Sequence, residues 1–156
     1  MLYIVDANNL AGKLGILFED DFDEKLISII KNWSKRKNKI YLIFDGVDGL
    51  GDKYTEDNIT VIYTPKDSYY ASADDKVVEI AKKLLTGEKE EIRVVTDDLG
   101  IIKKMENIVD NKFKIIKATK FAERIEKNID LSLNQKSELG EKEVRGINSE
   151  FLRIWK

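Results

Sequence analysis

Three short apolar runs in this chain of 156 residues each end at an aspartate. The runs cover residues 2–5, 39–44 and 91–96, and they are followed by Asp6, Asp45, and the pair Asp97 and Asp98. Runs of this length and composition predict buried strands. Carboxylates at the ends of neighbouring strands would repel one another unless cations were bound, and such oxygen ligands suit Mg²⁺ or Mn²⁺.

Two more acids, Asp74 and Asp75, stand at the start of a predicted helix. Apolar residues recur at helical spacing over residues 72–85, and Ser72 suits the N-cap position. In open α/β sheets, ligands bind beyond the carboxyl ends of the strands, and we expect this helix to begin on that side. We therefore expect one shallow acidic pocket, shared by Asp6, Asp45, Asp74 and Asp98.

Such a pocket could perform phosphodiester hydrolysis. Two divalent ions about 4 Å apart would activate a water for in-line attack and stabilise the departing oxygen. The chain has no histidine and no cysteine, which excludes Cys or His zinc sites, disulfides, thiol nucleophiles and imidazole acids or bases. Carboxylate-held Mg²⁺ or Mn²⁺ needs neither residue, so this chemistry remains open.

Each of these aspartates also has a purely structural explanation. An aspartate after a strand is often a turn former or a helix N-cap. Asp74 and Asp75 would favour the helix macrodipole in a first helical turn, and this explanation weighs most for Asp75. The shared location of the other acids is harder to explain by capping, which favours the metal interpretation.

Length and composition indicate one globular domain. Hydrophobic residues make up 42% of the chain and charged residues 36%. The net charge of −2 is not the basic footprint of a nucleic-acid binder, although a cluster of acidic metal ligands would mask local basic patches. We find no signal-peptide pattern and no run long enough to span a bilayer, and we expect a cytoplasmic protein without a membrane partner.

Strands and helices are expected to alternate along the chain. Further strands are predicted at residues 59–63 and 113–116, and helices at residues 21–36, 72–85, 99–107 and 120–128. This alternation predicts an α/β fold with a mostly parallel central sheet and helices on both faces. We place the domain at residues 1–129, followed by a linker at 130–141 and a helical tail up to residue 156 that packs on the same domain. Loops are expected at residues 46–58 and 64–71.

Four segments resemble the NYN and YacP-like members of the PIN-like nucleases. Residues 4–10, Ile-Val-Asp-Ala-Asn-Asn-Leu, look like the opening of that family, where a strand ends in Asp-x-x-Asn-Leu. Residues 44–46, 72–78 and 94–98 are similar to its second acidic position, its Ala-Asp helix start and its Val-x-Thr-[Ser/Asn]-Asp signature. The resemblance implies a single PIN-like domain and an endoribonuclease that depends on Mg²⁺ or Mn²⁺. It also implies RNA as the partner, with ribosome-associated RNA as one target.

Carried over residue by residue, the resemblance implies a catalytic set in which Asn9 orients water or phosphate and the metal-binding acids are Asp6, Asp45, Asp74 and Asp98. Asn8 competes with Asn9, because related PIN domains place the asparagine two residues after the aspartate. Asp97 stands where the family more often has Ser or Asn, which leaves open whether it also touches a metal.

RNA contacts are expected from basic, polar and aromatic residues near the acidic rim, because phosphates need charge and unpaired bases need flat surfaces. The candidates are Asn8, Lys13, Lys66, Tyr69, Tyr70, Lys103 and Lys104. The alternative is that these lysines are ordinary surface residues and that the tyrosines pack beneath their own loop.

Two other functions are compatible with parts of this sequence. A phosphoacceptor receiver domain also has acids at strand ends, and Lys117 would imitate its lysine, but its third strand ends in an acceptor aspartate whereas residues 59–63 lead into Thr64-Pro65. A non-catalytic PIN-like module that binds RNA or protein remains open. The oligomeric state, monomer or homodimer, is also open.

Overall fold

The computed structural model describes residues 1–34, 38–47, 52–65, 73–87, 91–108 and 113–137, with the backbone alone for residues 46–47, 65, 73–74 and 131–137. Six strands form one sheet: β1 (Leu2–Asp6), β2 (Lys39–Val47), β3 (Asp52–Glu56), β4 (Ile59–Pro65), β5 (Ile92–Val95) and β6 (Phe113–Ile116). The described helices are α1 (Ala7–Leu14), α2 (Phe22–Ser34), α3 (Ala73–Gly87), α4 (Leu99–Glu106) and α5 (Ala118–Ser137).

The sheet has the strand order β3-β4-β2-β1-β5-β6. All neighbours are parallel except β3, which pairs antiparallel with β4. From β1 the chain first builds one half of the sheet through β2 and β4, and it then returns to the other side of β1 with β5 and β6. The strand order therefore reverses at β1, the position where open α/β sheets bind ligands.

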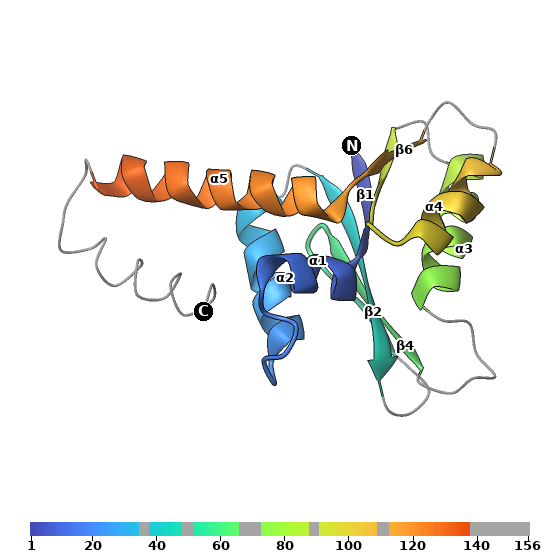
Figure 1. Ribbon diagram of the computed structural model, residues 1–156, viewed down its shortest axis with the longest axis horizontal. Coiled ribbons are helices and arrows are strands. Elements are labelled where there is room, and N and C mark those ends of the chain that lie inside the picture. The colour runs from blue at the N-terminus through green and yellow to red at the C-terminus, as the bar shows by residue number, and fades with distance from the viewer. Residues whose placement is uncertain (35–37, 48–51, 66–72, 88–90, 109–112, 138–156) are drawn as a thin grey trace.

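Helices cover both faces of the sheet, which confirms the predicted α/β architecture (Figure 1). Alternate residues of β1 pack on the two faces of the sheet, because successive side chains of a strand point to opposite faces. Tyr3 and Val5 pack in a core with α1, α2 and α5, whereas Leu2 and Ile4 pack with α3 and α4. Both layers are anchored to the same central strand, so the residues that follow it are held from both sides.

One strand was missed, and the predicted loop at residues 46–58 is wrong for residues 52–56. These residues form the edge strand β3, whose five side chains are all exposed. A strand without a buried face has no hydrophobic pattern, so the sequence did not predict it. It is paired to β4 through a two-residue turn in which Asp57 adopts a φ of 54°, a left-handed conformation that Asp tolerates.

Two helices also differ from the prediction. The eight-residue helix α1 begins directly after β1, in a segment to which no helix was assigned. The helix predicted at residues 120–128 is longer, since α5 continues to Ser137, and the linker predicted at 130–141 is therefore wrong for residues 130–137. These residues are mostly polar but include no Gly or Pro, so no helix breaker interrupts them. The predicted tail lies outside the described residues.

Within the described ranges, no helix combines the length and the apolar character that crossing a membrane requires.

Candidate functional site

Asp6 lies at the end of β1, in the centre of the sheet, and only 6% of it is exposed. It occupies the N-cap position of α1, but its side chain makes no capping hydrogen bond there. Instead, Oδ2 accepts a hydrogen bond of 3.1 Å from the hydroxyl of Thr96. Helix capping therefore does not explain this aspartate, and its carboxylate faces the neighbouring strand end.

Thr96 connects Asp6 to Asp98. Val5 of β1 pairs with Val95 of β5, which brings the next two residues, Asp6 and Thr96, side by side. The fully buried Thr96 hydroxyl donates to Asp6 and accepts a hydrogen bond of 3.0 Å from the backbone N–H of Asp98. The sequence motif included this threonine but no role was assigned to it. A polar residue at the end of an otherwise apolar strand was the available signal.

Asp98 is the N-cap of α4, so the structural explanation holds for one of its oxygens. Oδ1 accepts hydrogen bonds from the backbone N–H groups of Gly100 at 2.7 Å and Ile101 at 3.1 Å. A Cβ atom at Gly100 would come within 3.0 Å of the same oxygen, so glycine suits this close approach. Oδ2 accepts no hydrogen bond among the described residues. The cap therefore holds the carboxylate and leaves its second oxygen for a ligand.

Asp45 reaches the same edge of the sheet from β2. Asp6 pairs with Ile43, so Asp45 stands two residues, or about 7 Å, further along the strand direction. Its exposed side chain lies near the buried Thr64, whose hydroxyl donates to the carbonyl of Phe44 at 3.0 Å and to Asp45 Oδ1 at 3.3 Å. Thr64 on β4 thus contacts Asp45, although it shares its single hydroxyl proton with the nearer Phe44 carbonyl.

The two candidate asparagines occupy equivalent positions on opposite sides of Asp6. Asn8 Oδ1 accepts a hydrogen bond of 3.0 Å from the backbone N–H of Asp45, and Asn9 Oδ1 accepts one of 3.0 Å from that of Asp97. The first turn of α1 is thereby tied to the ends of β2 and β5. Both side-chain oxygens hold protein backbone, and the predicted contact of Asn9 with water or phosphate stays a prediction.

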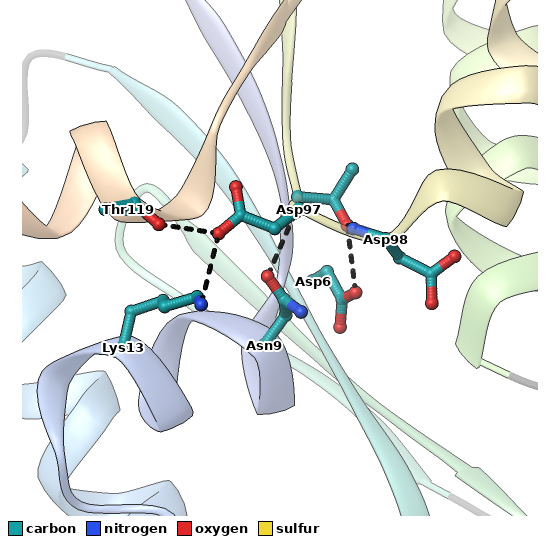
Figure 2. A network of polar contacts seen from close by, with 7 residues as sticks. Asp6, Asn9, Lys13, Asp97, Asp98 and Thr119 are labelled. Atoms are coloured by element: carbon teal, nitrogen blue, oxygen red, sulfur yellow. Dashed lines mark hydrogen bonds and ion pairs between the residues drawn. The ribbon is translucent and has the colours of Figure 1, made fainter.

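Asp97 and Asp98 are adjacent in sequence, but their carboxylates point in opposite directions (Figure 2). Asp97 Oδ2 accepts a hydrogen bond of 2.7 Å from the Thr119 hydroxyl and lies 3.6 Å from Lys13 Nζ. Burial raises the pKa of Asp97, but hydrogen bonding by Thr119 and Ala118 and the charge of Lys13 outweigh burial, so the net pKa is lowered. Asp97 is therefore a well-stabilised anion without any metal.

The remaining acids of the predicted set belong to α3. Asp74 is the second residue of that helix, and its side chain lies outside the described residues. Asp75 is exposed and forms an ion pair of 2.7 Å with Lys104 on α4. This contact gives Asp75 a structural role in joining the two helices.

The predicted RNA-binding residues are only partly described. Lys13 is paired with Asp97 and Lys104 with Asp75, whereas Lys103 is exposed on α4, five residues after Asp98. The other candidates, Lys66, Tyr69 and Tyr70, lie outside the described residues.

The donor set suits a hard divalent cation, because the chain offers oxygen ligands and has no histidine or cysteine. Among the described residues, Asp98 Oδ2 has no hydrogen-bond partner and the Asp45 side chain is exposed, so both are open to a ligand. Among the side chains that the structure describes, no three acids form a group that could hold a metal ion. Because the Asp74 side chain is not among them, the complete four-acid set stays a prediction.

A mostly parallel α/β sheet with acids at the carboxyl ends of β1, β2 and β5 is the arrangement expected of a PIN-like fold. The family model of the YacP-like NYN domain matches residues 3–153, and the chain belongs to this family. This confirms the resemblance seen in the sequence.

Two solved structures have a similar fold. One is a mutant of Rae1 (YacP) from Bacillus subtilis, with a TM-score of 0.61 and 20% identity over 88% of this chain and 83% of that one. The other is Rae1 (YacP) itself, with a TM-score of 0.59 and 21% identity over 98% of this chain and 91% of that one. No curated protein sequence matches the chain at a significant level.

Proposed function

We propose that the protein is an endoribonuclease that depends on Mg²⁺ or Mn²⁺ held by Asp6, Asp45, Asp74 and Asp98. The observation that carries the proposal is the Thr96 bridge, which holds Asp6 and Asp98 together where the strand order reverses. Asp45 reaches the same edge from β2. Bound at these acids, a divalent ion would polarise the phosphodiester and make an activated water available for hydrolysis.

The residues of the chain itself would position the substrate. The N-cap bonds hold Asp98 in place before RNA arrives, and Thr64 contacts Asp45. Lys103 is exposed on α4 beyond Asp98 and could contact a phosphate. Membership of the NYN family supports RNA as the substrate. Ribosome-associated RNA is one target to be tested.

A non-catalytic RNA-binding module is the second candidate. The observation that bears on it is that the described acids, which do not include Asp74, form no group of three that could hold a metal ion. The two functions differ in one measurable way, because a module would bind RNA without breaking its backbone.

Purified protein should linearise a circular single-stranded RNA with Mn²⁺ or Mg²⁺ and leave it intact in excess EDTA. A circular substrate has no ends, so its cleavage separates endonuclease from exonuclease action. The RNA is followed on a denaturing gel, beside a structured RNA and ribosome-bound RNA. Binding without cleavage under all metal conditions would support the module, and cleavage in EDTA would exclude the metal mechanism.

Millimolar Mn²⁺ should also raise the melting temperature of the protein, because a cation that binds only the native state stabilises it. Asp6→Asn should reduce this rise, since it removes one ligand charge, and it should not lower the melting temperature in EDTA. The exposed Asp130 of α5 offers a matched control, and Asp130→Asn should respond to Mn²⁺ like the wild type. An equal response of Asp6→Asn and wild type would place the cation elsewhere.

A further inference from the structure

The carboxylate of Asp97 joins three parts of the chain that are far apart in sequence. Asp97 follows β5, Lys13 belongs to α1, and Thr119 lies in the first turn of α5. The Asp97–Thr119 hydrogen bond is 2.7 Å long and the distance from Asp97 Oδ2 to Lys13 Nζ is 3.6 Å. We call these three residues, together with Asn9, the Asp97 clamp (Figure 2).

The charge of Asp97 is already balanced by protein groups. Lys13 supplies a positive charge, and the N-terminus of α5 carries the positive end of the helix dipole. The side chain of Asp97 is 18% exposed, and its buried Oδ1 accepts no hydrogen bond of normal geometry among the described residues. Protein therefore occupies or shields both oxygens of Asp97, because Thr119 and Lys13 hold Oδ2 and Oδ1 is buried. Asp98 Oδ2 also has no hydrogen-bond partner among the described residues, but it is not one of the buried atoms without a partner.

The backbone of Asp97 is held as firmly as its side chain. Its N–H donates to Asn9 Oδ1 at 3.0 Å, which attaches this residue to α1 a second time. The next peptide bond leads to Asp98, whose own N–H is bonded to Thr96. Any displacement of Asp97 would therefore move Asp98 relative to Asp6.

We propose that Asp97 is a positioning residue and not a metal ligand, and that the Asp97 clamp fixes Asp98 relative to Asp6 by tying the β5–α4 connection to α1 and α5. The effect on cleavage rests on the proposed function, whereas the structural role does not. Thr119 thereby helps to position the site, although its helix, α5, contributes no acid to the site.

Thr119 allows the clamp to be tested with nearly isosteric variants. Thr119→Val keeps the shape of the side chain and removes the hydroxyl, whereas Thr119→Ser keeps the hydroxyl. Because a hydrogen bond to a charged group is lost, Thr119→Val should lower the melting temperature in EDTA by about 3–10 °C, and Thr119→Ser should restore most of it. Lys120, the exposed next residue of α5, provides a control, and Lys120→Met should melt like the wild type.

The response to Mn²⁺ distinguishes a clamp role of Asp97 from a ligand role. With Asp97 as a clamp residue, Asp97→Asn and Thr119→Val melt at lower temperature in EDTA but keep the Mn²⁺-induced rise, whereas Asp98→Asn loses the rise. With Asp97 as a ligand, Asp97→Asn loses the rise as Asp98→Asn does, which would overturn the proposal. If Asp97→Asn does not fold, Thr119→Val and Thr119→Ser still test the clamp. Equal melting temperatures of these two variants would show that the Thr119 hydroxyl does not stabilise the protein, which would also overturn the proposal.

Cleavage kinetics test the positioning role itself. Single-turnover and steady-state cleavage of RNA by Thr119→Val should show kcat reduced about tenfold with KM little changed, and Thr119→Ser should recover kcat. Equal kcat in both variants and the wild type would show that the clamp is merely structural and would overturn the positioning claim. If the wild type cleaves no RNA, the proposed function fails, while the melting and Mn²⁺ measurements still support or overturn Asp97 as a clamp residue.

Discussion

Asp98→Asn should reduce metal-dependent RNA cleavage by about 10³-fold or more without destabilising the protein. Asparagine caps a helix as well as aspartate does, so its side-chain oxygen can still accept the hydrogen bonds from Gly100 and Ile101. What disappears is the negative charge of a proposed metal ligand, in a group whose members are expected to act together. Single-turnover cleavage at saturating Mn²⁺ measures the loss, and thermal unfolding shows that the fold is retained.

Asp98→Ala separates the two roles of this residue. It should be as inactive as Asp98→Asn, but it should also lose about 1 kcal/mol of stability because α4 loses its cap. The double variant Asp6→Asn with Asp98→Asn should be hardly worse than either single variant, since removing one member already disables the unit. Asp130→Asn should cleave like the wild type. Full metal-dependent activity of Asp98→Asn would refute the ligand assignment and favour the non-catalytic module.

Thr96→Val should impair both stability and cleavage. The substitution keeps the shape of a fully buried side chain but leaves the N–H of Asp98 without its acceptor and Oδ2 of Asp6 without this donor. Leaving a buried polar group unsatisfied costs roughly 1–3 kcal/mol, which urea unfolding in EDTA would measure. Cleavage should fall by about 10²-fold, because both acids lose the group that sets their separation.

Thr96→Ser is the matched control, since it keeps the hydroxyl and removes only a methyl group. It should retain most of the activity and lose stability through packing alone. If Thr96→Val and Thr96→Ser cleave at the same rate, the Thr96 bridge does not organise the site. The proposed function would then have to stand on the acids alone.

Much of the fold could be predicted from the sequence because its signals are local. Buried strands such as β1 and β5 are mostly apolar runs, and the helices α2 and α3 show an apolar stripe at helical spacing. The elements that were missed lack such signals. β3 has no buried face, and α1 is short and shares its residues with the motif that follows β1.

The positions of the site acids could also be predicted from the sequence, because a parallel sheet brings the carboxyl ends of its strands to one edge. Asp6, Asp45 and Asp98 were identified by where the apolar runs stop, and each lies at the carboxyl end of a central strand. The absence of histidine and cysteine determined the kind of metal that such a site could hold.

The role of each neighbouring polar residue was decided only by the tertiary structure. The family motif favours Asp98 as the metal-binding acid but leaves the role of Asp97 open. In the structure the chain turns between them, so the Asp97 carboxylate faces α5 and the Asp98 carboxylate caps α4. Likewise, Asn8 and Asn9 differ only in which strand end they meet. A hydrogen bond needs a partner within about 3 Å, and partners such as Thr119 come from segments that only folding brings together.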